Sequence, residues 1–157
     1  MHTKHYSVIT LDQISLDRIK LLHPKIKDEV LTLFTQAQSE ITPTIRIVQG
    51  LRTFAEQDAL FAKVPKVTNS RGGQSYHNYG LAIDFALLSD GKISWKVDDD
   101  WKKVVNVFKG SGYVWGGDWF KFKDYPHLEK TFGYNWRALQ AKHTNKEFIE
   151  GTEYVIL

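Results

Sequence analysis

The chain has 157 residues, 42% of them hydrophobic and 13% aromatic, which predicts one domain spanning 1–157 with a single core. Cysteine is absent, so disulfides, thiolate metal ligands and a cysteine nucleophile are excluded, and only His and carboxylates remain as metal ligands. The net charge of +3 is spread along the chain without a basic run, which argues against nucleic-acid binding.

The N-terminal part predicts two helices and a strand. Apolar residues recur at three- and four-residue steps across 11–40, a helical pattern that the proline at position 24 divides. We expect Pro24 in the first turn of the second helix. The alternating, β-branched segment 44–51 predicts a strand, and Arg52 lies at its end.

The middle of the chain predicts a helix, a polar loop and a hairpin. Thr53 caps a short helix over 53–63 in a capping box. Segment 66–76 contains almost nothing apolar and is typical of a loop that borders a functional site. A buried strand over 81–88 then turns at 90–91 into a second strand.

The last third predicts a helix over 98–109, candidate strands at 113–115 and 126–129, and a short helix over 136–141. Helices and strands in this order, with hairpin-like neighbours rather than a regular alternation, favour an α+β fold with a small antiparallel sheet flanked by helices.

Two segments, 75–84 and 118–127, concentrate residues with chemical potential. Asp84 is surrounded by apolar residues, and a carboxylate in the interior is costly unless it is paired or bound to a metal ion. His77 and His127 could converge with it on one cation, which is the three-ligand set with an open position that catalytic zinc uses. Each residue alone also has an ordinary explanation: a single His as a structural hydrogen-bonder, the Asp as partner of an Arg.

The pattern Ser-x-His-x-x-Gly-x-Ala-x-Asp over 75–84, followed by Asp-x-x-His over 124–127, resembles the zinc D-alanyl-D-alanine carboxypeptidase and L-alanyl-D-glutamate endopeptidase family, peptidase family M15. Trp-Gly-Gly-Asp-Trp at 115–119 is similar to the endolysin-like endopeptidase branch, and the likeness covers about residues 11–140. It implies a fold of the Hedgehog/DD-peptidase-like type.

The resemblance also implies roles for individual residues. His77, Asp84 and His127 map onto the ligands of one catalytic Zn²⁺. Asp124 maps onto the catalytic carboxylate that takes a proton from the attacking water, and Arg52 onto the basic residue beside the polarised carbonyl. Many relatives carry Glu at the position of Asp124, and Asp occurs there in the endopeptidase branch.

The resemblance implies a peptidoglycan peptidase that cuts the L-alanyl-D-glutamate bond of stem peptides, as a phage or prophage endolysin without a separate cell-wall-binding domain. Ser75 and Trp115 are expected to contact substrate. The alternatives are a D-alanyl-D-alanine carboxypeptidase or dipeptidase with the same zinc chemistry, and a non-catalytic wall-binding module that retains the metal. Trp119 is interpreted as core or rim packing.

The polar N-terminus lacks the apolar stretch of a secretory signal, and no segment has the length of a membrane span. We therefore expect a monomer made in the cytoplasm, without membrane insertion, that reaches the wall through a partner such as a holin, unless a signal has been removed. His2, His5, His23 and His143 are expected to have no catalytic role.

Overall fold

The computed structural model describes residues 9–157, so His2 and His5 lie outside the described residues. The α-helices are α1 (Gln13–Ile19), α2 (Lys27–Glu40), α3 (Phe54–Phe61), α4 (Asp99–Lys109) and α5 (Trp136–Thr144). The strands are β1 (Thr44–Gln49), β2 (Ala82–Ser89), β3 (Lys92–Ser94), β4 (Val114–Trp115) and β5 (His127–Glu129). Two short 3-10 helices are η1 (Tyr76–Tyr79) and η2 (Gly116–Asp118). The predicted elements are confirmed, with bounds that differ by a few residues.

The strands form one antiparallel sheet in the order β1-β2-β5-β4, and β3 pairs with the far end of β2. The α+β prediction is therefore confirmed. β2 lies between β1 and β5, and in this register Asp84 stands opposite His127 on β5. A register irregularity between Ile47 and Gln49 ends the regular pairing of β1 beside the same residue.

Local sequence explains where the helices begin. Thr53 accepts a hydrogen bond from the N–H of Glu56, whose side chain accepts from Thr53 in return, so the predicted capping box of α3 is confirmed. Asp98 caps α4 by accepting from the N–H of Trp101, and the apolar face of that helix is buried.

The expected position of Pro24 is wrong, because α2 begins three residues later, at Lys27. The side chain of His23 explains the difference. Its Nδ1 accepts from the N–H of Lys25, and its Nε2 lies 2.7 Å from the carbonyl oxygen of Val155, so the ring fixes a separate turn. Pro24 lies in that turn, which leads into the helix.

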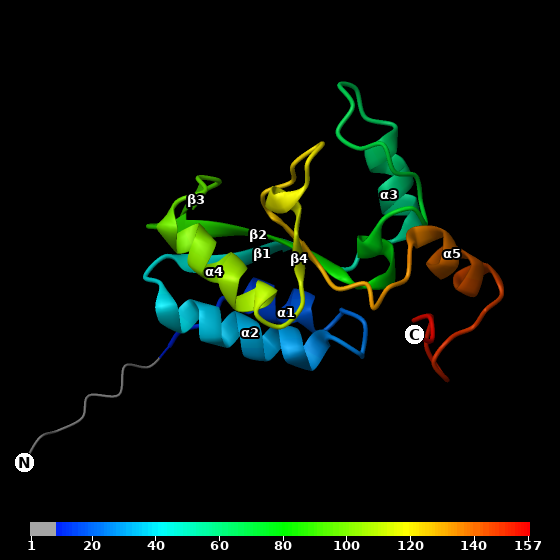
Figure 1. Ribbon diagram of the computed structural model, residues 1–157, viewed down its shortest axis with the longest axis horizontal. Coiled ribbons are helices and arrows are strands. Elements are labelled where there is room, and N and C mark those ends of the chain that lie inside the picture. The colour runs from blue at the N-terminus through cyan, green and yellow to red at the C-terminus, as the bar shows by residue number, and fades with distance from the viewer. Residues whose placement is uncertain (1–8) are drawn as a thin grey trace, which may run out of the picture.

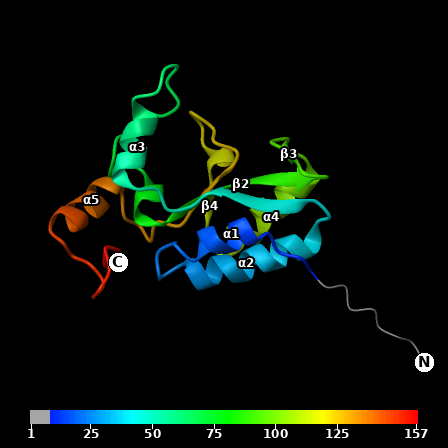
Figure 2. The ribbon, with the colours of Figure 1, turned by 180° about the vertical axis from the view of Figure 1, so that it is seen from behind.

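Helices α1, α2 and α4 cover one face of the sheet, while α3 and α5 lie at one end of it (Figures 1 and 2). Large side chains that are almost fully buried fill the layer between sheet and helices: Phe34, Ile45, Ile47, Ile83, Phe85, Trp101, Phe108 and Leu128. Two loops, 62–75 and 119–126, rise from the opposite side of the sheet in both views. We call them the green arm and the yellow arm, after their colours in Figure 1.

Within the described residues, the structure contains no helix of the length and apolar character that a membrane span requires.

Candidate metal centre

A cleft with a volume of about 890 Å³ lies between the two arms, and its floor is formed by the ends of β2 and β5. The green arm contributes Val67 and Ser70 to its wall, and the yellow arm contributes Phe122 and Lys123. The floor carries the ionisable residues Arg52, His77, Asp84, Asp124, His127 and Glu129. A cleft of this size, with a few converging polar groups, is typical of a ligand site.

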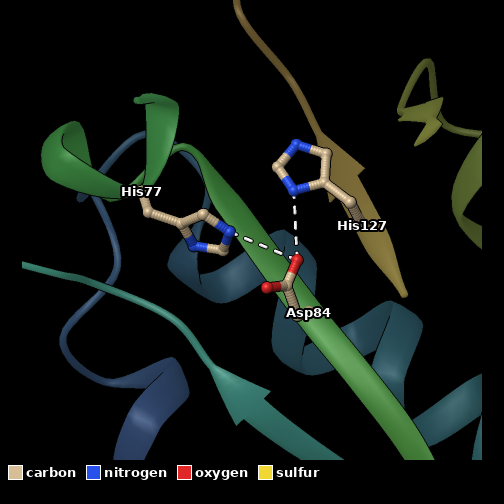
Figure 3. Close-up of side chains that lie close together, drawn as sticks. All are labelled: His77, Asp84 and His127. Carbon is tan, nitrogen blue, oxygen red and sulfur yellow. Dashed lines mark hydrogen bonds and ion pairs between the residues drawn. The ribbon is translucent and has the colours of Figure 1, made fainter. Parts of the chain in front are cut away.

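Three of these side chains meet at one point. Oδ1 of Asp84 lies 3.2 Å from Nε2 of His77 and 3.0 Å from Nδ1 of His127 (Figure 3). Asp84 and His127 face each other because they are register partners on adjacent strands. His77 reaches them from η1, whose last residue is followed by Gly80 in the left-handed conformation (φ 69°), so the chain turns directly into β2.

The spacing of these atoms fits a metal ion. One nitrogen from each His and one oxygen from Asp84 all lie within 4.8 Å of one another. Ligands held at about 2.0–2.2 Å from a tetrahedral ion stand roughly 3.3–3.6 Å apart, close to the separations from Asp84. Two imidazoles and one carboxylate are also the donor set of many catalytic zinc sites. The sequence-predicted ligands are therefore brought together in a group that could hold a metal.

The far nitrogens of both rings are already engaged. Nδ1 of His77 donates to the carbonyl oxygen of Gly50 at 2.9 Å, and Nε2 of His127 donates to Oε1 of Glu129 at 2.8 Å. Both partners are acceptors only, so a neutral ring carries its proton on the far nitrogen. In that neutral form the near nitrogens present lone pairs to a metal ion.

Electrostatics tie the three residues together. Burial opposes ionisation of Asp84, but the charges of the two rings and their hydrogen bonds outweigh it and hold the pKa of this carboxyl well below its usual range. Burial also disfavours a charged His127, yet hydrogen bonds to Asp84 and Glu129 raise its pKa to about 9. A cation is thus strongly favoured at this point, whether a proton on His127 or a metal ion.

Asp124 lies beside this group without belonging to it. Its Oδ2 is 4.0 Å from Nδ1 of His127, the nitrogen that faces Asp84. Burial and the negative charge of Asp84 raise the pKa of Asp124, and nearby cations only partly offset this effect. Its backbone N–H donates to the carbonyl oxygen of Gly116 at 3.0 Å, which anchors the backbone of Asp124 beside the cleft.

Arg52 brings a positive charge to the cleft floor. Its backbone N–H donates to the carbonyl of His77 at 3.0 Å, and Nη1 donates to Oε1 of Gln57 at 2.8 Å. Burial lowers the pKa of the guanidinium, and the charges of Asp84, Glu56 and Asp124 oppose that shift. Nε is buried without a hydrogen-bond partner among residues 9–157.

Comparison with known proteins shows to which family the chain belongs. The chain is 46% identical over 122 residues to the peptidoglycan L-alanyl-D-glutamate endopeptidase CwlK of Bacillus subtilis strain 168, covering 69% of this chain and 72% of that protein. A profile of peptidase family M15, described as D-alanyl-D-alanine carboxypeptidase, matches residues 68–130, which include all three candidate ligands. The chain belongs to peptidase family M15.

Two further comparisons agree. The L-alanyl-D-glutamate peptidase of Listeria phage A118 is 41% identical over 61 residues, which is 38% of this chain but only 22% of that protein. The crystal structure of the L-Ala D-Glu endopeptidase ChiX of Serratia marcescens matches with a TM-score of 0.58 at 25% identity, covering 76% of this chain and 88% of that chain. The fold predicted from the resemblance is therefore confirmed, and the chain is a metallopeptidase by family.

Of the other residues named in the sequence analysis, some line the cleft and some do not. Ser75 lines the cleft, and its hydroxyl accepts from the N–H of His77 at 3.3 Å. Trp115 is not among the residues that line the cleft; its indole donates to the carbonyl of Tyr125 at 2.7 Å. Trp119 lines the cleft instead, with its ring 5.3 Å from that of His127.

Asp84 is largely buried, as its apolar sequence neighbours predicted, and the 21% of its side chain that is exposed faces the cleft. Glu129 was not identified from the sequence at all. The available signal was its spacing of two residues from His127, which puts both side chains on one face of a strand.

Proposed function

We propose that this protein is a zinc-dependent peptidase that hydrolyses the L-alanyl-D-glutamate bond of peptidoglycan stem peptides. The observation that carries the proposal is the meeting of His77, Asp84 and His127 at the cleft floor, with a free carboxylate 4.0 Å from His127. The names of the relatives CwlK, ChiX and the phage peptidase support the choice of bond.

His77, Asp84 and His127 would hold the ion. When bound there, zinc supplies Lewis-acid chemistry, which acidifies a water molecule and polarises a carbonyl. The hydrogen bonds from the far nitrogens orient the rings and select the neutral tautomer whose near nitrogens can bind the ion.

Asp124 is the proton carrier in this proposal. Its carboxylate takes a proton from the attacking water and later gives it to the nitrogen of the leaving amine. The raised pKa of Asp124 suits this role, because the carboxyl group must keep the proton after it leaves the water and until it is transferred to the amine. Being close to the ligands without belonging to them leaves Asp124 free to act as base and then acid.

Arg52 stabilises the negative charge that develops on the scissile carbonyl oxygen. Its tether to Gln57 holds the guanidinium at the floor, so little reorganisation is needed during the reaction. Ser75 is proposed as a contact for the bound peptide from the edge of the cleft. The arms enclose an extended stem peptide between them.

The test is digestion of purified peptidoglycan by the wild type and by Asp124→Ala, with mass spectrometry of the released muropeptides. Asp118→Ala is the matched control, since Asp118 lies on η2 and pairs with Lys109 outside the cleft lining. We expect cleavage between L-alanine and D-glutamate by the wild type and the control, and a loss of at least about 100-fold for Asp124→Ala.

Two outcomes would overturn parts of the proposal. Release of free D-alanine with the L-alanyl-D-glutamate bond intact would show a carboxypeptidase, the activity in the family description. Unaltered lysis by Asp124→Ala would refute the role of that carboxylate, and absence of lysis on several wall chemistries would favour a binding module.

A further inference from the structure

Glu129 occupies an unusual place for a carboxylate. It ends β5, a strand paired on both sides by β2 and β4, and only 8% of the residue is exposed. It follows His127 by two residues, so the two side chains lie on the same face of the strand. Their contact is direct, at 2.8 Å between Oε1 of Glu129 and Nε2 of His127.

The contact decides which nitrogen of His127 can bind a cation. A neutral imidazole carries one proton, and the carboxylate of Glu129 can only accept. The proton therefore sits on Nε2, and the lone pair sits on Nδ1, which faces Asp84 at 3.0 Å. With the proton on Nδ1 instead, the lone pair would point away from the other two ligands.

Charge explains why a carboxylate stands here and not a neutral acceptor. A buried carboxylate is costly unless it is paired, and the side-chain hydrogen bond that Glu129 makes within residues 9–157 is the one to His127. Together Asp84 and Glu129 carry two negative charges, which match one divalent cation. His77 needs only the neutral carbonyl of Gly50 for the same orienting contact.

We infer that Glu129 is a positioning residue of the metal centre, which holds His127 in the Nε2–H tautomer and strengthens Nδ1 as a ligand. The inference rests on the proposed function, since it concerns the ion of that site. Loss of such a partner weakens metal binding by about 10–100-fold in other sites. We expect a similar loss here, even where substrate binding is unchanged.

Glu129 also lines the cleft, so a direct contact with substrate is the competing role. The two roles differ in what they change. A substrate contact would raise KM and leave the affinity for metal unaltered, whereas a positioning role lowers the affinity for metal in the absence of any substrate.

The experiment is a zinc titration of metal-free protein against a chromophoric chelator, for the wild type, Glu129→Gln and Glu129→Ala. Glu129→Gln keeps the shape and an acceptor but loses the charge, so about 10-fold weaker binding is expected; Glu129→Ala should lose about 100-fold. Glu29→Gln is the control, because Glu29 is also a paired carboxylate, with Nζ of Lys130 at 2.8 Å, away from the cleft.

Nitrogen NMR of the His127 ring in the zinc-loaded wild type tests the same inference without any substitution. A proton on Nε2 supports it, and a proton on Nδ1 overturns it. Equal zinc affinity of the wild type and both Glu129 variants would also overturn it, while leaving an active zinc peptidase intact. A wild type that binds no zinc would instead refute the proposed function itself.

Discussion

Gly116 offers a test of how finely Asp124 must be placed. A methyl group added at Gly116 would overlap the carbonyl oxygen of Asp124 and stand 3.0 Å from its Cβ and 3.1 Å from its carbonyl carbon. Non-bonded carbons settle at about 3.5–4.0 Å, so Gly116→Ala must push the backbone of Asp124 back by roughly 0.5–1 Å. Displacements of about 1 Å cost on the order of 100-fold in rate.

We therefore expect Gly116→Ala to lower kcat on a stem peptide by about 10–100-fold while the protein keeps its zinc affinity. The control is Gly110→Ala at the end of α4, where the added carbon would meet backbone oxygens at an ordinary 3.4 Å. Steady-state kinetics, zinc titration and thermal unfolding of the three proteins provide the comparison. A folded Gly116→Ala enzyme with the kcat of the wild type would refute the placement of Asp124 as proton carrier.

Three other predictions concern the metal, the core and pH. Zinc at 100 times its dissociation constant should stabilise the metal-free protein by about 2.7 kcal/mol, and a melting temperature indifferent to chelator would contradict the site. Phe34→Ala should cost about 3–5 kcal/mol in urea unfolding, since Phe34 is 0% exposed; a loss below about 1 kcal/mol would disprove its role in the core. Burial would raise the pKa of Asp12, but hydrogen bonds from Arg46 and Ser15 leave this pKa lowered. Ionised Asp12 therefore adds stability that is fully present above the unfolded pKa of about 4 and is lost as the pH falls through the lowered folded pKa. Wild type and Asp12→Asn should differ in urea midpoint at pH 7, and the difference should shrink as the pH falls below about 4.

The fold and the juxtaposition of His77 with Asp84 were predictable because local patterns encode them. The apolar face of α4, the capping box of α3 and the turn after β2 each arise from a few neighbouring residues. The motif from Ser75 to Asp84 likewise needs only η1 and the start of β2 to take shape. The recognition of His127 depended on resemblance, since no local pattern shows that β5 pairs with β2.

Other features depend on irregular backbone or on side-chain detail. The sequence offered both Trp115 and Trp119, and only the turn at η2 decides that the second lines the cleft. The apolar neighbours of Asp84 predicted that it is buried. The sequence pattern does not show that this end of the central strand opens on a cleft. The protonated nitrogen of His127 follows from one contact with Glu129, which no spacing rule specifies without knowledge of the strand.

In the proposed metal centre, the register of β2 against β5 would link the binding of zinc to the end of folding. His77 and Asp84 are seven positions apart and are joined by one short turn, whereas His127 lies 43 positions beyond Asp84. A chain in which β1 and β2 have paired but β5 has not docked has only two of the three candidate ligands in place, so we expect it to bind zinc weakly. Loading with zinc should therefore report completion of the sheet, and a register error of one residue would turn His127 away and leave the enzyme metal-free.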